Sequence, residues 1–120
     1  MDSSAEDPKK IASEHFRVLW HPKARDDLAK LTPDLAEKIF EAASYKLSRA
    51  PQFIGQPLKG TTKMLWKIRF SKYRVIYTLN AGSREVWVIS VGKRDTVYRD
   101  EFVQSWVRLA IAIRQMEKSS

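Results

Sequence analysis

Residues 59–98, KGTTKMLWKIRFSKYRVIYTLNAGSREVWVISVGKRDTVY, decide the fold of this chain. Three runs rich in β-branched and aromatic residues lie within them, at 64–70, 73–79 and 85–91. Short polar links separate the runs, a pattern that is typical of consecutive β-strands. The stretch therefore predicts three strands in succession, and the remaining segments are expected to pack around them.

The first run separates apolar from basic side chains, because side chains alternate between the two faces of a strand. The apolar face would carry Met64, Trp66, Ile68 and Phe70, and the basic face Lys63, Lys67 and Arg69. A two-residue link at 71–72 would pair Phe70 with Tyr73 and Arg69 with Arg74. The apolar faces coincide in that register, whereas a slip by one residue would reverse every side chain. Opposed arginines destabilise a sheet, so we expect an anion to bind there.

Length and composition indicate one globular domain. The chain has 120 residues, of which 43% are hydrophobic and 30% are charged, enough for one modest core. Residues 1–14 are polar, contain Pro8 and lack the apolar segment of a signal peptide. We therefore predict a flexible tail at 1–14 and a single domain at 15–120. Without cysteine or an apolar run of membrane-spanning length, we expect a cytoplasmic protein with no membrane contact and no disulfides.

The net charge of +8 is concentrated in the middle of the chain. Nine of the 14 acidic residues lie at or before Glu41, and none occurs between Glu41 and Glu85. That interval contains nine lysines and arginines, a distribution typical of proteins that bind nucleic-acid phosphates. A solvated basic surface without a ligand is the alternative interpretation.

The segments on either side predict helices. Residues 15–21 predict a short strand, and Pro22 opens a helix that ends near residue 31. Thr32 and Pro33 begin a second helix that should run to about Arg49, whereas 50–58, with two prolines and a glycine, predict a loop. A last helix is predicted from about 98 to 116. The order β-α-α-β-β-β-α predicts an α+β domain with a mostly antiparallel four-stranded sheet and helices on one face.

Lysine, arginine and tyrosine are the residues available for chemistry. The only histidines, His15 and His21, flank the first predicted strand and are interpreted as structural. The basic half has almost no carboxylates to hold a metal ion, so we predict neither a metal site nor a cofactor. RNA cleavage needs neither, because the ribose 2′-OH can attack the adjacent phosphate. The protein then orients the groups, neutralises charge and transfers protons.

An ordered series of short motifs adds a resemblance to this picture. The motifs read HPKA at 21–24, DLAKL at 27–31, LKG at 58–60, LWKIR at 65–69, YRVIY at 73–77, VISVGKR at 88–94 and VYR at 97–99. In this order they resemble the RelE/ParE superfamily of bacterial and archaeal toxins, over about residues 16–99. The resemblance implies a compact domain that enters the ribosomal A site and cuts mRNA. It also implies a cognate acidic antitoxin that binds the toxin, as a hetero-oligomer, and neutralises it.

The resemblance further implies a set of catalytic residues. They are the basic pair Lys67 and Arg69, the YR arginine Arg74, the arginine after the last strand, Arg94, and the following tyrosine, Tyr98. Around them we expect RNA contacts from Lys59, Lys63, Lys72 and Lys93. The chain departs from the family in having arginine rather than lysine at 69, Ser-Lys rather than Gly-Asp at 71–72, and a shorter link from Arg94 to Tyr98.

Two other functions stay open. A ParE-like protein would inhibit DNA gyrase without cutting anything itself, but such members generally lack the full basic-plus-tyrosine set. An inactive member would bind only RNA or its antitoxin. For the site residues themselves the alternative is structural: Lys67 and Arg69 would form a solvated strand face, Arg74 would pair with a carboxylate such as Glu101, and Tyr98 would cap the last strand.

Overall fold

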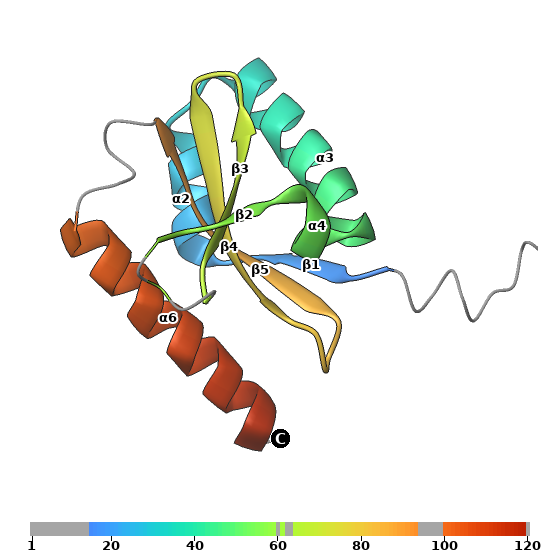
Figure 1. The fold of residues 1–120 in the computed structure, drawn as a ribbon. Coiled ribbons are helices and arrows are strands. Elements are labelled where there is room, and N and C mark those ends of the chain that lie inside the picture. The colour runs from blue at the N-terminus through green and yellow to red at the C-terminus, as the bar shows by residue number, and fades with distance from the viewer. Residues whose placement is uncertain (1–14, 60, 62–63, 94–99, 120) are drawn as a thin grey trace, which may run out of the picture.

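A computed structural model of the chain describes residues 15–59, 61, 64–93 and 100–119. The elements follow in the order β1 (Arg17–Trp20), α2 (Pro22–Ala29), α3 (Pro33–Arg49), α4 (Pro51–Ile54), β2 (Gln56–Pro57), β3 (Trp66–Phe70), β4 (Tyr73–Asn80), β5 (Glu85–Lys93) and α6 (Asp100–Ser119). A twisted sheet lies at the centre, between the α2–α3 pair and α6 (Figure 1). The predicted α+β class is confirmed.

The sheet has the strand order β1-β5-β4-β3-β2. β1 runs parallel to β5, and the other neighbours are antiparallel. The predicted register of the β3–β4 hairpin is confirmed, since Phe70 lies opposite Tyr73 and Arg69 opposite Arg74. Ser71, in the link between them, adopts a left-handed φ of 56°. This register fixes which side chains of β3 and β4 share a face.

The prediction of four strands and a loop at 50–58 was wrong. This stretch forms the short helix α4 and the two-residue strand β2, whose Gln56 pairs with Lys67 of β3. Its two prolines are compatible with these elements: Pro51 begins α4, where its missing N–H has no helical partner. Pro57 lies on the edge strand, where a missing donor is tolerated. The fifth strand therefore covers part of the outer edge of β3.

The α2–α3 hairpin covers one face of the sheet. Thr32 Oγ1 accepts a hydrogen bond from the Leu35 N–H at 3.4 Å and so caps α3 as predicted. The apolar stripe of α3 buries Ile39, Ala43 and Leu47. They belong to one core cluster with the sheet residues Ile68, Tyr73, Val75, Tyr77, Val86, Val88 and Val91.

The other face is covered by α6, which corrects the prediction that all helices lie on one face. Trp106 and Ala110 of α6 pack with Leu65, Ile76 and Ile89 in a second core cluster. Met64 packs there too, rather than beside Trp66, because β3 begins only at Trp66 and strand alternation does not reach Met64. The predicted stripe residue Ile113 is also buried.

Several predictions fall beyond the part that the structure describes. These are the tail at 1–14, the start of the last helix before Asp100, and the side chains of Phe102 and Met116 in the α6 stripe. Within the described ranges, no helix combines the length and apolar character needed to cross a membrane.

Candidate functional site

Three of the five predicted catalytic residues meet at one place on the sheet. Lys67 and Arg69 of β3 and Arg74 of β4 line a depression of about 350 Å³. Strand alternation places them on the face opposite to the α2–α3 hairpin, because Ile68 and Val75 between them are buried under that hairpin. We call this depression the basic depression. Its remaining lining residues are Ile54 and Gln56.

The two arginines of the basic depression differ in exposure. Arg74 is only 8% exposed and donates a hydrogen bond to the Tyr73 carbonyl at 3.4 Å, whereas Arg69, directly opposite, is exposed. Neither arginine forms an ion pair with a carboxylate in the described part of the chain. Opposed like charges destabilise a sheet, and a buried charge is costly without a counter-ion. An anion with two oxygens, such as a phosphate, can accept hydrogen bonds from both guanidinium groups.

The α4–β2 segment supplies the wall of the basic depression, and sequence reasoning missed it. Tyr77 of β4 holds this segment, since its hydroxyl donates a 2.7 Å hydrogen bond to the Pro51 carbonyl. Burial raises the pKa of the Tyr77 hydroxyl, so it remains a donor. Ile54 and Gln56, the lining residues that form this wall, come shortly after Pro51 in the sequence. The adjacent apolar residues Phe53 and Ile54, within a stretch interpreted as a loop, were the available signal.

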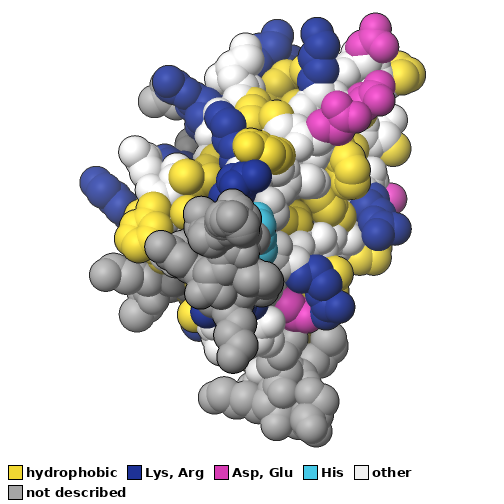
Figure 2. Space-filling view, turned by 90° about the vertical axis from the view of Figure 1, so that its right-hand side faces the viewer, with side chains coloured by type: hydrophobic (Ala, Val, Ile, Leu, Met, Phe, Trp, Pro, Cys, Tyr) yellow, Lys and Arg dark blue, Asp and Glu magenta, His cyan; other side chains and the backbone are white. Residues whose placement is uncertain are grey.

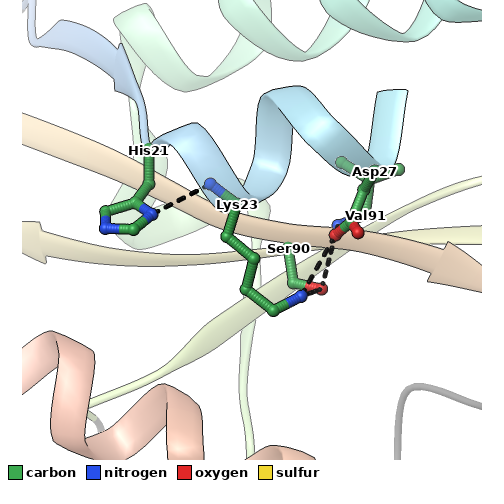
Figure 3. Close-up of polar contacts among 5 residues, drawn as sticks. All are labelled: His21, Lys23, Asp27, Ser90 and Val91. Atoms are coloured by element: carbon green, nitrogen blue, oxygen red, sulfur yellow. Dashed lines mark hydrogen bonds and ion pairs between the residues drawn. The ribbon is translucent and has the colours of Figure 1, made fainter. Parts of the chain in front are cut away.

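A polar cluster joins α2 to the end of β5 (Figure 3). Asp27 Oδ2 accepts hydrogen bonds from the Ser90 hydroxyl and the Val91 N–H, both at 3.0 Å, and from Lys23 Nζ at 3.4 Å. His21 caps α2 by accepting from the Lys23 N–H at 3.1 Å, so it lies at the strand-to-helix corner as predicted. The cluster fixes β5 at Val91, shortly before the chain reaches Arg94.

The remaining predicted site residues are distributed as follows. Lys59 and Lys72 are exposed and do not line the basic depression, and Lys93 is exposed at the last position of β5, opposite Tyr73. Lys63, Arg94 and Tyr98 lie outside the described residues. The structure thus brings together Lys67, Arg69 and Arg74. In the portion of the chain that is described, no group of three or more His, Asp or Glu residues could hold a metal ion.

A second depression adjoins the first. We call it the Tyr45 groove; it has a volume of about 320 Å³ and is lined by Tyr45, Lys46, Arg49, Ile54, Ile68 and Arg69. Arg49 lies over the Tyr45 ring, with Cζ 4.7 Å from the ring centroid. On the side of the molecule that carries α3 and α4, Lys and Arg side chains are interleaved with exposed hydrophobic side chains, and most acidic side chains lie at the upper end (Figure 2). Sequence reasoning did not identify Tyr45 as a functional residue.

Comparison with known proteins supports a family assignment. The family model described as the ParE toxin of the type II toxin–antitoxin system parDE matches residues 18–98. Toxin RelG of Mycobacterium tuberculosis is 31% identical over 84 residues, which are 70% of this chain and 97% of that protein. Toxin RelE of the same organism is 30% identical over 84 residues, covering 70% of this chain and 87% of that protein.

A solved structure agrees with these relatives. A chain of the toxin–antitoxin complex RelBE2 from Mycobacterium tuberculosis matches with a TM-score of 0.62 and 30% identity. The match covers 67% of this chain and 92% of that chain. The family match over residues 18–98 spans the sheet, the helical hairpin and the basic depression. The chain belongs to the RelE/ParE superfamily of type II toxin–antitoxin toxins, as a RelE-family toxin.

Proposed function

We propose that this toxin is a ribosome-dependent mRNA endoribonuclease that uses the ribose 2′-OH of its substrate as the nucleophile. The observation that carries the proposal is the meeting of Lys67, Arg69 and Arg74 in one depression, with Arg69 opposite Arg74. Neither arginine has an ion pair to a carboxylate within the described residues. The site is therefore electrostatically suited to a phosphodiester.

Each residue has a role in this proposal. The scissile phosphate lies between Arg69 and Arg74, whose guanidinium groups neutralise the charge that develops on the phosphorane oxygens. Arg74 is the better fixed of the two, because it is buried whereas Arg69 is exposed. Lys67 Nζ assists proton transfer from the 2′-OH. Arg94 and Tyr98, which follow β5 in the sequence, complete the set through the family resemblance, with Arg94 at the leaving oxygen.

Ribosome dependence follows from the weak proton-transfer groups of this set. Arginine holds its proton at any working pH, so it stabilises charge but does not shuttle protons. Histidine is the usual general base near neutral pH, but neither His15 nor His21 lines the basic depression, and His21 caps α2 instead. The ribosomal A site would supply the RNA conformation in which the 2′-OH is in line with the leaving oxygen. Because its proposed substrate is mRNA on the ribosome, the toxin would act in the cytoplasm.

A cognate acidic antitoxin is the proposed partner. The solved relative RelBE2 is a toxin–antitoxin complex, and the net charge of +8 in this chain suits an acidic partner. Inhibition of DNA gyrase is the competing function. The basic depression favours RNA cleavage, because gyrase inhibition requires no phosphate site between two arginines.

The proposal is tested by single-turnover cleavage of mRNA on programmed ribosomes and of the same mRNA without ribosomes. We expect rapid cleavage only on the ribosome, and a loss of about 10²–10³ in rate for Arg74→Ala. Arg108→Ala, which removes an exposed arginine on α6, is the matched control and should cut at the wild-type rate. Equal cleavage of free and ribosome-bound mRNA would contradict ribosome dependence. Gyrase inhibition without cleavage would contradict the proposal altogether.

A further inference from the structure

The Tyr45 groove lies directly beside the basic depression. We propose that it is a base-binding subsite, which holds one unpaired base of the RNA whose phosphate lies between Arg69 and Arg74. This inference rests on the proposed function, because it assigns the neighbouring surface to the same substrate. The occupant is a nucleotide of single-stranded RNA next to the scissile phosphate, recognised by stacking rather than by its sequence.

Continuity between the two depressions is the first argument. Arg69 and Ile54 line both of them, so the two sites meet at the edge of β3, with the groove on the α3 side and the basic depression on the opposite side. A base and its phosphate are joined through one sugar, and an RNA chain with its phosphate in the basic depression therefore has an adjacent base within reach of the groove. Because Arg69 lines both depressions, its guanidinium group can contact the phosphate while the adjacent base lies in the groove.

The chemistry of the groove is the second argument. Tyr45 is 62% exposed and lies near the end of α3, where Arg49 on the next turn stacks on its ring at 4.7 Å. Ile54, 42% exposed, adds an apolar surface, and Lys46 adds a further positive charge. An aromatic ring paired with a guanidinium, within a basic rim, is the combination that binds unpaired bases of single-stranded nucleic acid.

The size and charge of the groove decide between a base and a protein partner. A volume of about 320 Å³ fits one small planar group, whereas an amphipathic antitoxin helix would need a longer apolar groove. Three of the six lining residues are lysine or arginine, which suits the phosphates on either side of a base. An acidic antitoxin segment is the competing occupant, and the experiment below separates the two.

The experiment measures binding of short 2′-O-methyl RNA, which cannot be cleaved, by fluorescence anisotropy at low ionic strength. One abasic nucleotide is moved stepwise along the oligonucleotide. Tyr45→Ala should weaken binding of the intact RNA about 5- to 150-fold, and Tyr45→Phe should bind like wild type. At one position the abasic nucleotide should weaken wild-type binding by a similar factor and have no further effect on Tyr45→Ala. That non-additivity would identify the base that stacks on Tyr45.

The matched control is Phe40→Ala. Phe40 is another exposed aromatic residue of α3, but its ring packs on Trp20 at 5.0 Å and it does not line the groove. It should bind all the oligonucleotides like wild type, and circular dichroism reports that each variant is folded.

The remaining outcomes overturn the inference in distinguishable ways. If Tyr45→Ala binds intact RNA like wild type while Arg74→Ala loses it, the groove holds no base but the phosphate site stands. If Tyr45→Ala binds RNA like wild type but no longer binds a co-expressed acidic antitoxin, the groove binds the protein partner. If the wild type cleaves mRNA on ribosomes but does not bind the oligonucleotides, the base-binding subsite is overturned and the proposed function stands. If the wild type neither cleaves mRNA on ribosomes nor binds the oligonucleotides, both the subsite and the proposed function are overturned.

Discussion

Gly55 lies directly against the hydroxyl of Tyr77: a Cβ atom at Gly55 would be 1.8 Å from Tyr77 Oη and 2.8 Å from Tyr77 Cζ. Tyr77 belongs to the core of β4, and Gly55 joins α4 to β2. The same hydroxyl donates to the Pro51 carbonyl at 2.7 Å. One buried side chain therefore fixes both ends of α4, and with them the wall of the basic depression.

Gly55→Ala should destabilise the fold, because the added methyl group has no room unless Tyr77 or the α4–β2 backbone moves. We expect the free energy of unfolding to fall by about 1–3 kcal/mol, measured by chemical denaturation. Gly82→Ala is the control, since a Cβ there would lie 3.3 Å from Asn80 Oδ1 in an exposed turn. If both glycine variants lose the same small amount, the contact between Gly55 and Tyr77 does not fix the segment.

The stability of the protein should fall at high pH through Tyr77. Burial raises the pKa of its hydroxyl above the usual value of about 10, so the folded state favours the neutral form. The stability that the neutral Tyr77 hydroxyl contributes is fully present below about pH 10. It is lost as the pH rises above the pKa of the unfolded state towards the higher pKa of the folded state. Denaturation curves of wild type and Tyr77→Phe measured from pH 7 upward should therefore converge above about pH 10. A constant difference at all pH values would contradict this prediction.

Asp27→Asn should loosen the end of β5. The carboxylate accepts from two neutral donors and from Lys23, and its side chain is only 15% exposed, whereas an amide carries one acceptor and no charge. We expect a loss of about 1.5–3 kcal/mol in the free energy of unfolding and faster hydrogen exchange at the Val91 amide. Asp26→Asn, at the exposed neighbouring position, should change neither. Wild-type exchange at Val91 in Asp27→Asn would show that the cluster does not hold the strand.

The β3–β4 register was predictable because local signals agreed. A two-residue link and matching apolar faces left one register for Phe70 and Tyr73. The α4–β2 segment was not predictable, because Tyr77 holds Pro51 across 26 residues of sequence and no local pattern reports that contact. The position of α6 could be predicted in part from the sequence. Ile76 and Ile89 make β4 and β5 nearly continuous apolar runs, and such runs indicate strands that are buried on both faces.

The candidate site was predictable to the same extent as the hairpin. Alternation placed Lys67 and Arg69 on one face, and the register brought Arg74 beside them. The Tyr45 groove was missed because its residues come from α3, α4 and β3, which are distant in sequence. The helical pattern of α3 indicated only which side chains are buried, and Tyr45 is exposed.

Arg69→Thr should stabilise the free protein and impair its activity. Arg69 lies opposite Arg74 without a carboxylate ion pair in the described residues, and like charges in that position destabilise a sheet. Threonine suits a strand and removes the repulsion, so the free energy of unfolding should rise by about 0.2–1 kcal/mol at low ionic strength. The lower part of that range is expected because Arg69 is exposed and solvent screens its charge. The same change removes one of the two guanidinium groups that we propose hold the phosphate, so cleavage on programmed ribosomes should slow by about 10²–10³.

Inorganic phosphate separates the two effects in this variant. We expect phosphate to bind the folded wild type between the two arginines, and it should then raise wild-type stability more than that of Arg69→Thr. The advantage of the variant should therefore shrink as phosphate is added at constant ionic strength. Lys38→Thr, which removes an exposed cation on α3, serves as the control and should respond to phosphate like wild type. If Arg69→Thr is less stable than wild type without phosphate, Arg69 supports the sheet rather than a ligand. An anion site built from two opposed arginines would then not exist in the free toxin.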